Sequence, residues 1–136
     1  MIRFQAEDTP LPPIDPAQLS VWIETVAARQ GYAVGQINYL FCSEAKILEV
    51  NRSFLQHDYY TDIITFDYSE RNFIAGDIYI SPETVRSNAL LFGTNFDEEL
   101  LRVIIHGVLH LCGQGDKSEI EAAEMRQKEN EALRML

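Results

Sequence analysis

The chain has 136 residues, of which 46% are hydrophobic and 24% charged, so it can form one globular domain with its own core. Its formal net charge of −10 at pH 7 excludes nucleic-acid binding through overall positive charge. No apolar run has the length of a membrane span, and the N-terminus has no apolar signal region. We therefore expect a cytoplasmic protein with no membrane partner.

The first half of the chain predicts two strands and two helices. Residues 1–6 read as a short strand, and Asp15 followed by proline predicts a helix over 16–30. Apolar residues alternate over 35–42, which is typical of a half-buried strand. Ser43 is expected to cap the helix that follows.

Two further strands are predicted in the second half. Residues 62–66 and 76–80 are rich in β-branched and aromatic side chains, and the loop between them is short enough for an antiparallel pair. The sum is about four strands and five helices. We expect a mixed α+β fold in which the helices cover one sheet, in a single domain over residues 1–136.

Three helices complete the predicted fold. Ser81 opens a helix that ends near residue 93, and Asp97 is expected to cap the next one. Ser118 is expected to begin a final amphipathic helix whose apolar positions include Ile120 and Met125.

A pair of histidines on one of these helices is the strongest chemical signal. His106 and His110 lie four residues apart, on one helix face, and Gly113 and Gly115 let the chain turn back to offer Asp116. Two imidazoles and a carboxylate can hold a transition metal and leave a position for water, as catalytic sites do. Burial of two unpartnered imidazoles would cost roughly 1–3 kcal/mol each, and a metal ion removes that cost.

The same residues also allow structural interpretations. A histidine on an apolar helix is most often a hydrogen-bonded core residue, and Cys112 is more often buried than a ligand. Asp116 can be a cap, but Ser118 and Glu121 form a Ser-x-x-Glu capping box that leaves it free. Gly107 costs about 1 kcal/mol relative to alanine, so close packing or the approach of a ligand is expected there. It also replaces the general base of His-Glu-x-x-His peptidases.

Three other residues are weaker candidates. Asp62 and Asp77 lie at strand starts and can orient metal ligands or bind backbone, although turn chemistry is the commoner role. His57 is followed closely by Tyr59 and Tyr60, whose rings can stack on the bases of single-stranded RNA.

Ordered motifs over about residues 47–131 carry a resemblance to a known family. The matching positions are Leu48 and Asn51 (Leu-x-x-Asn), 61–66 (Thr-Asp-Val-Leu-Ser-Phe), 76–78 (Gly-Asp-Ile), 106–113 (His-Gly-x-Leu-His-Leu-x-Gly), Met125 and Glu129. In this order and at this spacing, they resemble the YbeY family of bacterial metal-dependent endoribonucleases.

The resemblance implies a zinc-dependent endoribonuclease specific for single-stranded RNA. It implies a role in rRNA maturation, including the 3′ end of 16S rRNA, and in ribosome quality control. The expected partners are single-stranded RNA and the ribosome or its proteins. The expected cofactor is one Zn²⁺ per chain, held by His106, His110 and Asp116, which act in catalysis through the metal; His57 is an additional catalytic candidate.

The chain departs from the family pattern at two positions. The family places a histidine as third ligand where this chain has Asp116, so the charge of the site is lower by one and metal-bound water is expected to be less acidic. The family commonly has an arginine for catalysis or RNA contact where this chain has Leu55, and His57 or Arg52 are the available substitutes.

Two other classes of function fit part of the pattern. One is a non-catalytic ribosome-maturation binding factor with a structural metal site, which Leu55 and the negative net charge favour. The other is a non-haem iron oxygenase, which also uses two histidines and a carboxylate. Two ligands one helical turn apart fit that class poorly.

Overall fold

The computed structural model describes residues 1–55 and 61–136, and the expected number of strands and helices is confirmed there. The elements are β1 (Ile2–Ala6), α1 (Pro16–Arg29), β2 (Ala33–Phe41), α2 (Glu44–Leu55), β3 (Ile63–Asp67), β4 (Phe73–Ile80), α3 (Pro82–Phe92), α4 (Phe96–Leu111) and α5 (Glu119–Leu133). His57, Tyr59 and Tyr60 lie outside the described residues.

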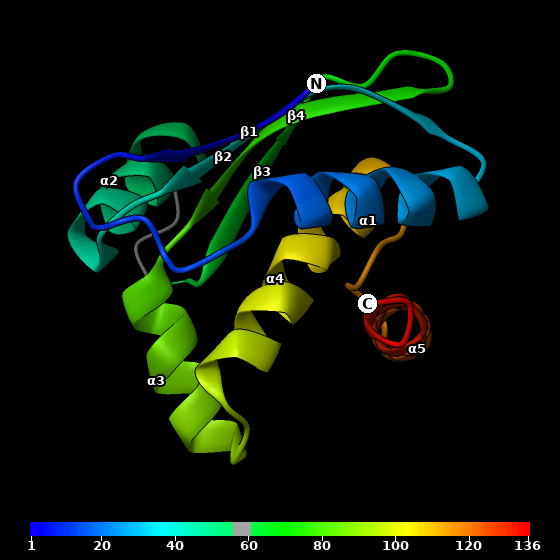
Figure 1. Ribbon diagram of the computed structural model, residues 1–136. Coiled ribbons are helices and arrows are strands. Elements are labelled where there is room, and N and C mark those ends of the chain that lie inside the picture. Colours follow the sequence, from blue (N-terminus) through cyan, green and yellow to red (C-terminus); the bar gives the residue numbers. More distant parts are fainter. Residues whose placement is uncertain (56–60) are drawn as a thin grey trace.

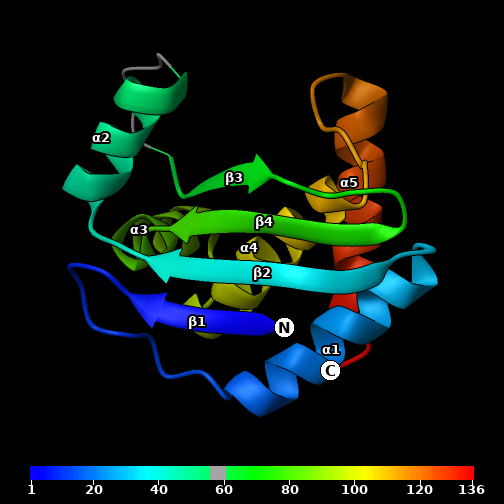
Figure 2. The same cartoon turned by 90° about the horizontal axis from the view of Figure 1, so that it is seen from above.

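The four strands form one mixed sheet in the order β1-β2-β4-β3 (Figure 2). β1 and β4 both run parallel to β2, and β3 is antiparallel to β4, with Ile63 opposite Ile80. The predicted antiparallel pair is therefore confirmed. β3 is an edge strand of the sheet, and it begins at Ile63, directly after Asp62.

Helix α4 is the centre of the helical layer. It packs against β3 and β4 on one side and contacts α1, α3 and α5 on the others (Figure 1). Alternate residues of β2, namely Ile37, Tyr39 and Phe41, are fully buried beneath this layer. The Tyr39 hydroxyl donates a hydrogen bond of 2.9 Å to the carbonyl oxygen of Ile104, which ties β2 to α4. The helix that carries the histidine pair is thus held firmly on the sheet.

A smaller apolar cluster lies under α2. Ile47 and Val50 of α2 are buried together with Cys42 and with Ile64 of β3. Since neighbouring residues of a strand point to opposite faces, Ile64 packs toward α2 while Ile63 points toward α4. The edge strand β3 is therefore fixed from both sides.

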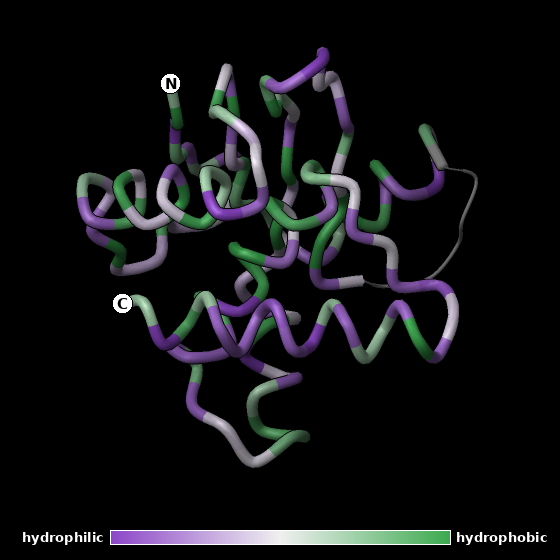
Figure 3. The backbone as a smooth tube through the Cα atoms, turned by 90° about the vertical axis from the view of Figure 1, so that its right-hand side faces the viewer, coloured by the Kyte–Doolittle hydropathy of each residue, from purple (hydrophilic) through white to green (hydrophobic). Residues whose placement is uncertain are grey.

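Two local expectations are wrong. The N-cap of α4 is Asn95, whose side chain accepts a hydrogen bond of 2.8 Å from the backbone N–H of Glu98, and Asp97 lies in the first turn. Ile120 of α5 is 75% exposed, although Met125 is buried as expected. Most of α5 is hydrophilic (Figure 3), so this helix buries only a narrow stripe against α4. In the described part of the chain, no helix has the length and apolar character needed to cross a bilayer.

Candidate metal centre

The last two turns of α4 present the histidine pair. The ring centroids of His106 and His110 are 4.5 Å apart, and the two rings are nearly perpendicular, at 86°. α4 ends at Leu111, and Gly113 adopts a left-handed φ of 92° that a side chain would disfavour. This turn sends the chain back along the helix end and brings Asp116 to the histidines.

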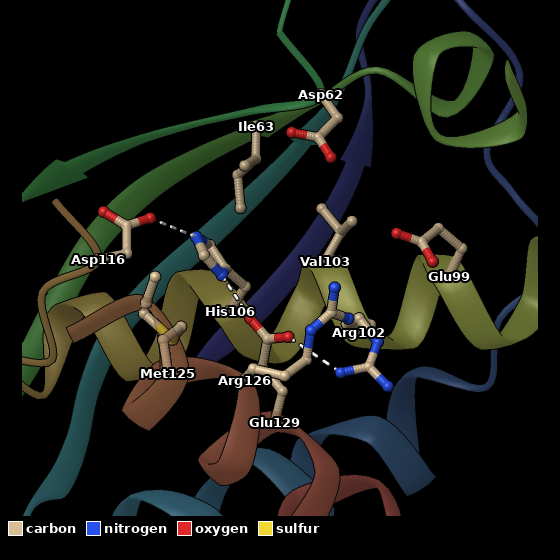
Figure 4. Close-up of a pocket in the computed structure, with 11 residues that line it drawn as sticks. Asp62, Ile63, Glu99, Arg102, Val103, His106, Asp116, Met125, Arg126 and Glu129 are labelled. Atoms are coloured by element: carbon tan, nitrogen blue, oxygen red, sulfur yellow. Dashed lines mark hydrogen bonds and ion pairs between the residues drawn. The ribbon is translucent and has the colours of Figure 1, made fainter. Parts of the chain in front are cut away.

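The three predicted ligands converge. Asp116 Oδ2 lies 3.5 Å from His106 Nε2 and 3.3 Å from His110 Nε2. One possible ligand atom from each of the three residues lies within 4.8 Å of the others, so the group can hold a metal ion. Figure 4 shows the Asp116 carboxylate directed at the His106 ring. Two imidazole nitrogens and one carboxylate oxygen are a donor set that suits transition metals.

The nitrogens on the other side of both rings are already engaged. His106 Nδ1 lies 2.6 Å from Glu129 Oε2, and His110 Nδ1 lies 2.9 Å from the carbonyl oxygen of Gln114. A carbonyl can only accept, so Nδ1 of His110 donates to it, and Nε2 is the ring nitrogen turned toward Asp116. The carboxylate of Glu129 favours the same tautomer in His106. Such outer contacts are what orient histidine ligands in metal sites.

Glu129 lies between Arg102 and His106 and contacts both. It is 5% exposed, and its Oε1 lies 3.0 Å from Nη1 of Arg102, which gives the carboxylate a partner on each oxygen. Burial raises the pKa of Glu129, but the hydrogen bonds and charges of His106 and Arg102 outweigh burial and lower it. Burial lowers the pKa of His106, but Glu129, Asp116 and Asp62 outweigh burial and raise it. In the metal-free protein, Arg102 and His106 therefore stabilise the ionised form of Glu129, and Glu129 stabilises the protonated form of His106.

No role for Glu129 in the site is predicted from the sequence. It appeared only as a position in the closing helix of the family pattern. A signal was present, because Glu129 follows Met125 at helical spacing on the buried stripe of α5, where an acidic residue needs a partner. Arg102 likewise precedes His106 by four residues, on the same face of α4.

The two strand-start aspartates have different positions. Asp62 lies beside His106, and its Oδ2 accepts a hydrogen bond of 3.4 Å from Asn88. Burial raises the pKa of Asp62, and the charge of His106 partly opposes this. Asp77 instead accepts a hydrogen bond of 3.0 Å from Asn38 of β2 and does not line the site.

The remaining candidates are not brought to the three ligands. Burial raises the pKa of the Cys112 thiol to about 11, which disfavours the thiolate that binds metals. Arg52 lines neither of the hollows beside the histidines. Gly107 is explained by packing, because a Cβ there would lie 3.0 Å from Ile78 Cδ1 and 3.2 Å from Ile63 Cδ1.

The candidate centre lies between two hollows of the surface. Both are lined by Asp62, Ile63, His106 and Asp116. The first, of about 280 Å³, extends along α4 and α5, and the second, of about 730 Å³, extends along β3. A ligand that runs through both hollows would pass directly over the three convergent side chains.

Comparison with known proteins gives a consistent match. A sequence model described as "Endoribonuclease YbeY" matches residues 6–136. A protein named endoribonuclease YbeY from Parabacteroides distasonis is 56% identical over 99% of this chain and 95% of its own length. A protein of the same name from Phocaeicola vulgatus is 55% identical over 100% of this chain and 99% of its own length. The solution structure of TM1509 from Thermotoga maritima is 31% identical, with a TM-score of 0.69 over 97% of this chain and 86% of that one.

Proposed function

Because the chain belongs to the endoribonuclease YbeY family, we propose that it is a zinc-dependent endoribonuclease that cleaves single-stranded RNA. Relatives more than 50% identical over nearly the whole chain carry the endoribonuclease name, which supports the reaction class. Zinc is proposed from the donor set, since two imidazoles and a carboxylate with an open position are common in catalytic zinc sites.

The single observation that carries the proposal is the convergence of three ligand atoms whose supporting contacts are already made. His106 and His110 each turn Nε2 toward Asp116, while Glu129 and the Gln114 carbonyl hold the opposite nitrogens. A structural pair of core histidines would not need an exposed carboxylate between its two free nitrogens.

These residues divide the work of the site. His106, His110 and Asp116 would bind the metal ion, which when bound polarises a phosphoryl oxygen or lowers the pKa of water. Glu129 keeps the proton of His106 on Nδ1, and Arg102 keeps Glu129 ionised and in place. The two hollows leave the RNA backbone room on either side of the centre.

The wider role is proposed from the family resemblance. It implies action on rRNA, including the 3′ end of 16S rRNA, in the cytoplasm, with the ribosome or its proteins as partners. Because the net charge is −10, the protein as a whole does not attract RNA, and contact with RNA has to be made locally, at the two hollows.

The alternative classes have less support. A peptidase of the His-Glu-x-x-His type needs a glutamate at position 107, where this chain has glycine and where a Cβ would lie 3.0 Å from Ile78 Cδ1. A non-catalytic binding factor needs neither an open metal position nor relatives named as endoribonucleases. An oxygenase would require a redox-active iron, which metal analysis of protein purified without oxygen would reveal.

The test joins metal analysis to an RNA cleavage assay. We expect about one zinc per chain and cleavage of single-stranded but not double-stranded RNA. His110→Ala should remain folded, lose zinc and lose cleavage, whereas Cys112→Ala, at the C-cap of α4, should keep both. Cleavage by His110→Ala at the parental rate would assign the activity to another site or to a contaminant.

A further inference from the structure

We propose that Arg126 binds a backbone phosphate of the RNA substrate beside the candidate metal centre. This inference rests on the proposed function and adds a substrate-binding residue to it. It starts from the charges that line the two hollows.

The described residues that line the two hollows include three cationic side chains. Arg102 is committed to Glu129, at 3.0 Å, and its side chain is 16% exposed. Lys117 lines the hollow along β3, directly after Asp116. Arg126 lines the hollow along α5 and is exposed, and within residues 1–55 and 61–136 it has no carboxylate at ion-pair distance. Among the described residues, the guanidinium of Arg126 therefore has no carboxylate partner in the first hollow.

Helical spacing places Arg126 on the face of α5 that lines the hollow. Ala122, Arg126 and Glu129 share one face of α5, and all three line the same hollow as His106. Ala122 is small and leaves the hollow open one turn before Arg126. Figure 4 shows the Arg126 side chain extending from α5 toward Val103 of α4. Its base is thus one helical turn from the residue that holds His106.

The chemistry of a guanidinium suits a phosphodiester better than other ligands. Its planar fork can donate two parallel hydrogen bonds to two phosphate oxygens, which the ammonium of Lys117 cannot do. In a chain of net charge −10, a phosphate at this place needs both the metal ion and a local cation.

The experiment compares Arg126→Gln with Arg134→Gln. Arg134 is also an exposed arginine, at the end of α5, and it lines neither hollow, so both variants change net charge equally. Circular dichroism first establishes that both are folded. Binding to metal-loaded protein is then measured by fluorescence anisotropy with a single-stranded DNA probe, which has the phosphates but not the 2′-hydroxyls, and KM and kcat are measured with RNA of the same sequence.

Arg126→Gln should weaken probe binding and raise KM about five- to tenfold, with a smaller effect on kcat. The slope of log affinity against log salt should fall by about 0.7, the value for one phosphate contact with a single strand. Arg126→Lys should keep the slope and recover part of the affinity. Arg134→Gln should match the parent.

Equal affinities for Arg126→Gln and the parent, equal losses in both glutamine variants, or no binding of either oligonucleotide by the parent would overturn the inference. Failure of the proposed function looks different. In that case RNA stays intact, so binding to RNA can be measured directly. A loss of RNA affinity in Arg126→Gln but not in Arg134→Gln still supports the phosphate contact. Cleavage with an unchanged KM in Arg126→Gln would keep the function and reject the contact.

Discussion

Glu129 Oε2 lies 2.6 Å from His106 Nδ1, although the two residues belong to different helices and are 23 positions apart in the chain. The contact joins α5 to the ligand face of α4. It makes α5 part of the candidate metal centre and gives Glu129 a positioning role, since it touches the ligand and would not touch the metal.

The first prediction concerns this contact. Glu129→Gln keeps the size of the side chain but removes the charge that holds His106 and Arg102. Zinc affinity should fall about tenfold, within the range found for outer-shell partners of metal ligands. Competition with a chromophoric chelator measures it. Glu131→Gln, on the exposed side of α5, should leave the affinity unchanged, and a parental affinity in Glu129→Gln would show that His106 needs no such partner.

The second prediction is the pH dependence of stability in chelator-treated protein. The raised pKa of His106 adds stability below its unfolded value of 6.5, and this is lost as pH rises through the folded pKa. The lowered pKa of Glu129 adds stability above its unfolded value of 4.5, and this is lost as pH falls through the folded pKa. The contribution of the pair should therefore be greatest between these two values. Thermal unfolding measures it, and Glu129→Gln should flatten the profile across that range.

The third prediction concerns the aspartate ligand. Asp116→Ala removes one of the three proposed ligands and should weaken zinc binding severely. Asp116→His restores the ligand of the family pattern, should keep zinc, and should move the pH–rate profile for RNA cleavage to lower pH, because imidazole donates less charge than carboxylate. Undiminished metal affinity in Asp116→Ala would make Asp116 a loop residue.

The fourth prediction concerns the packing of α4 against the sheet. Gly107→Ala gains about 1 kcal/mol of helix propensity but places a methyl group 3.0 Å from Ile78 Cδ1, and overpacking of a core costs about 1–3 kcal/mol. We expect a net loss of about 1 kcal/mol in the free energy of unfolding. Urea titrations of Gly107→Ala, Ile78→Val and the double variant test this, because removal of Cδ1 should relieve part of the strain. Strict additivity would contradict the packing explanation.

Much of the fold was predictable from local patterns. The antiparallel pair of β3 and β4 follows from two β-rich runs and a short loop, and the helix starts at Asp15, Ser81 and Ser118 follow from capping residues. The sequence favours Asp97 as the cap of α4, whereas the structure has Asn95 there, because several residues in this stretch can cap and only the backbone geometry chooses among them.

The candidate site divides along the same line. Spacing within one segment is enough to predict that His106 and His110 share a helix face and that the capping by Ser118 leaves Asp116 free. The support of His106 by Glu129 and Arg102, the position of Asp77 away from the site and the position of Arg126 in the hollow follow from the packing of distant segments. These depend on how α5 docks on α4 and which face each strand presents. That docking depends on packing between segments that are distant in the chain, and local patterns of apolar residues do not predict it.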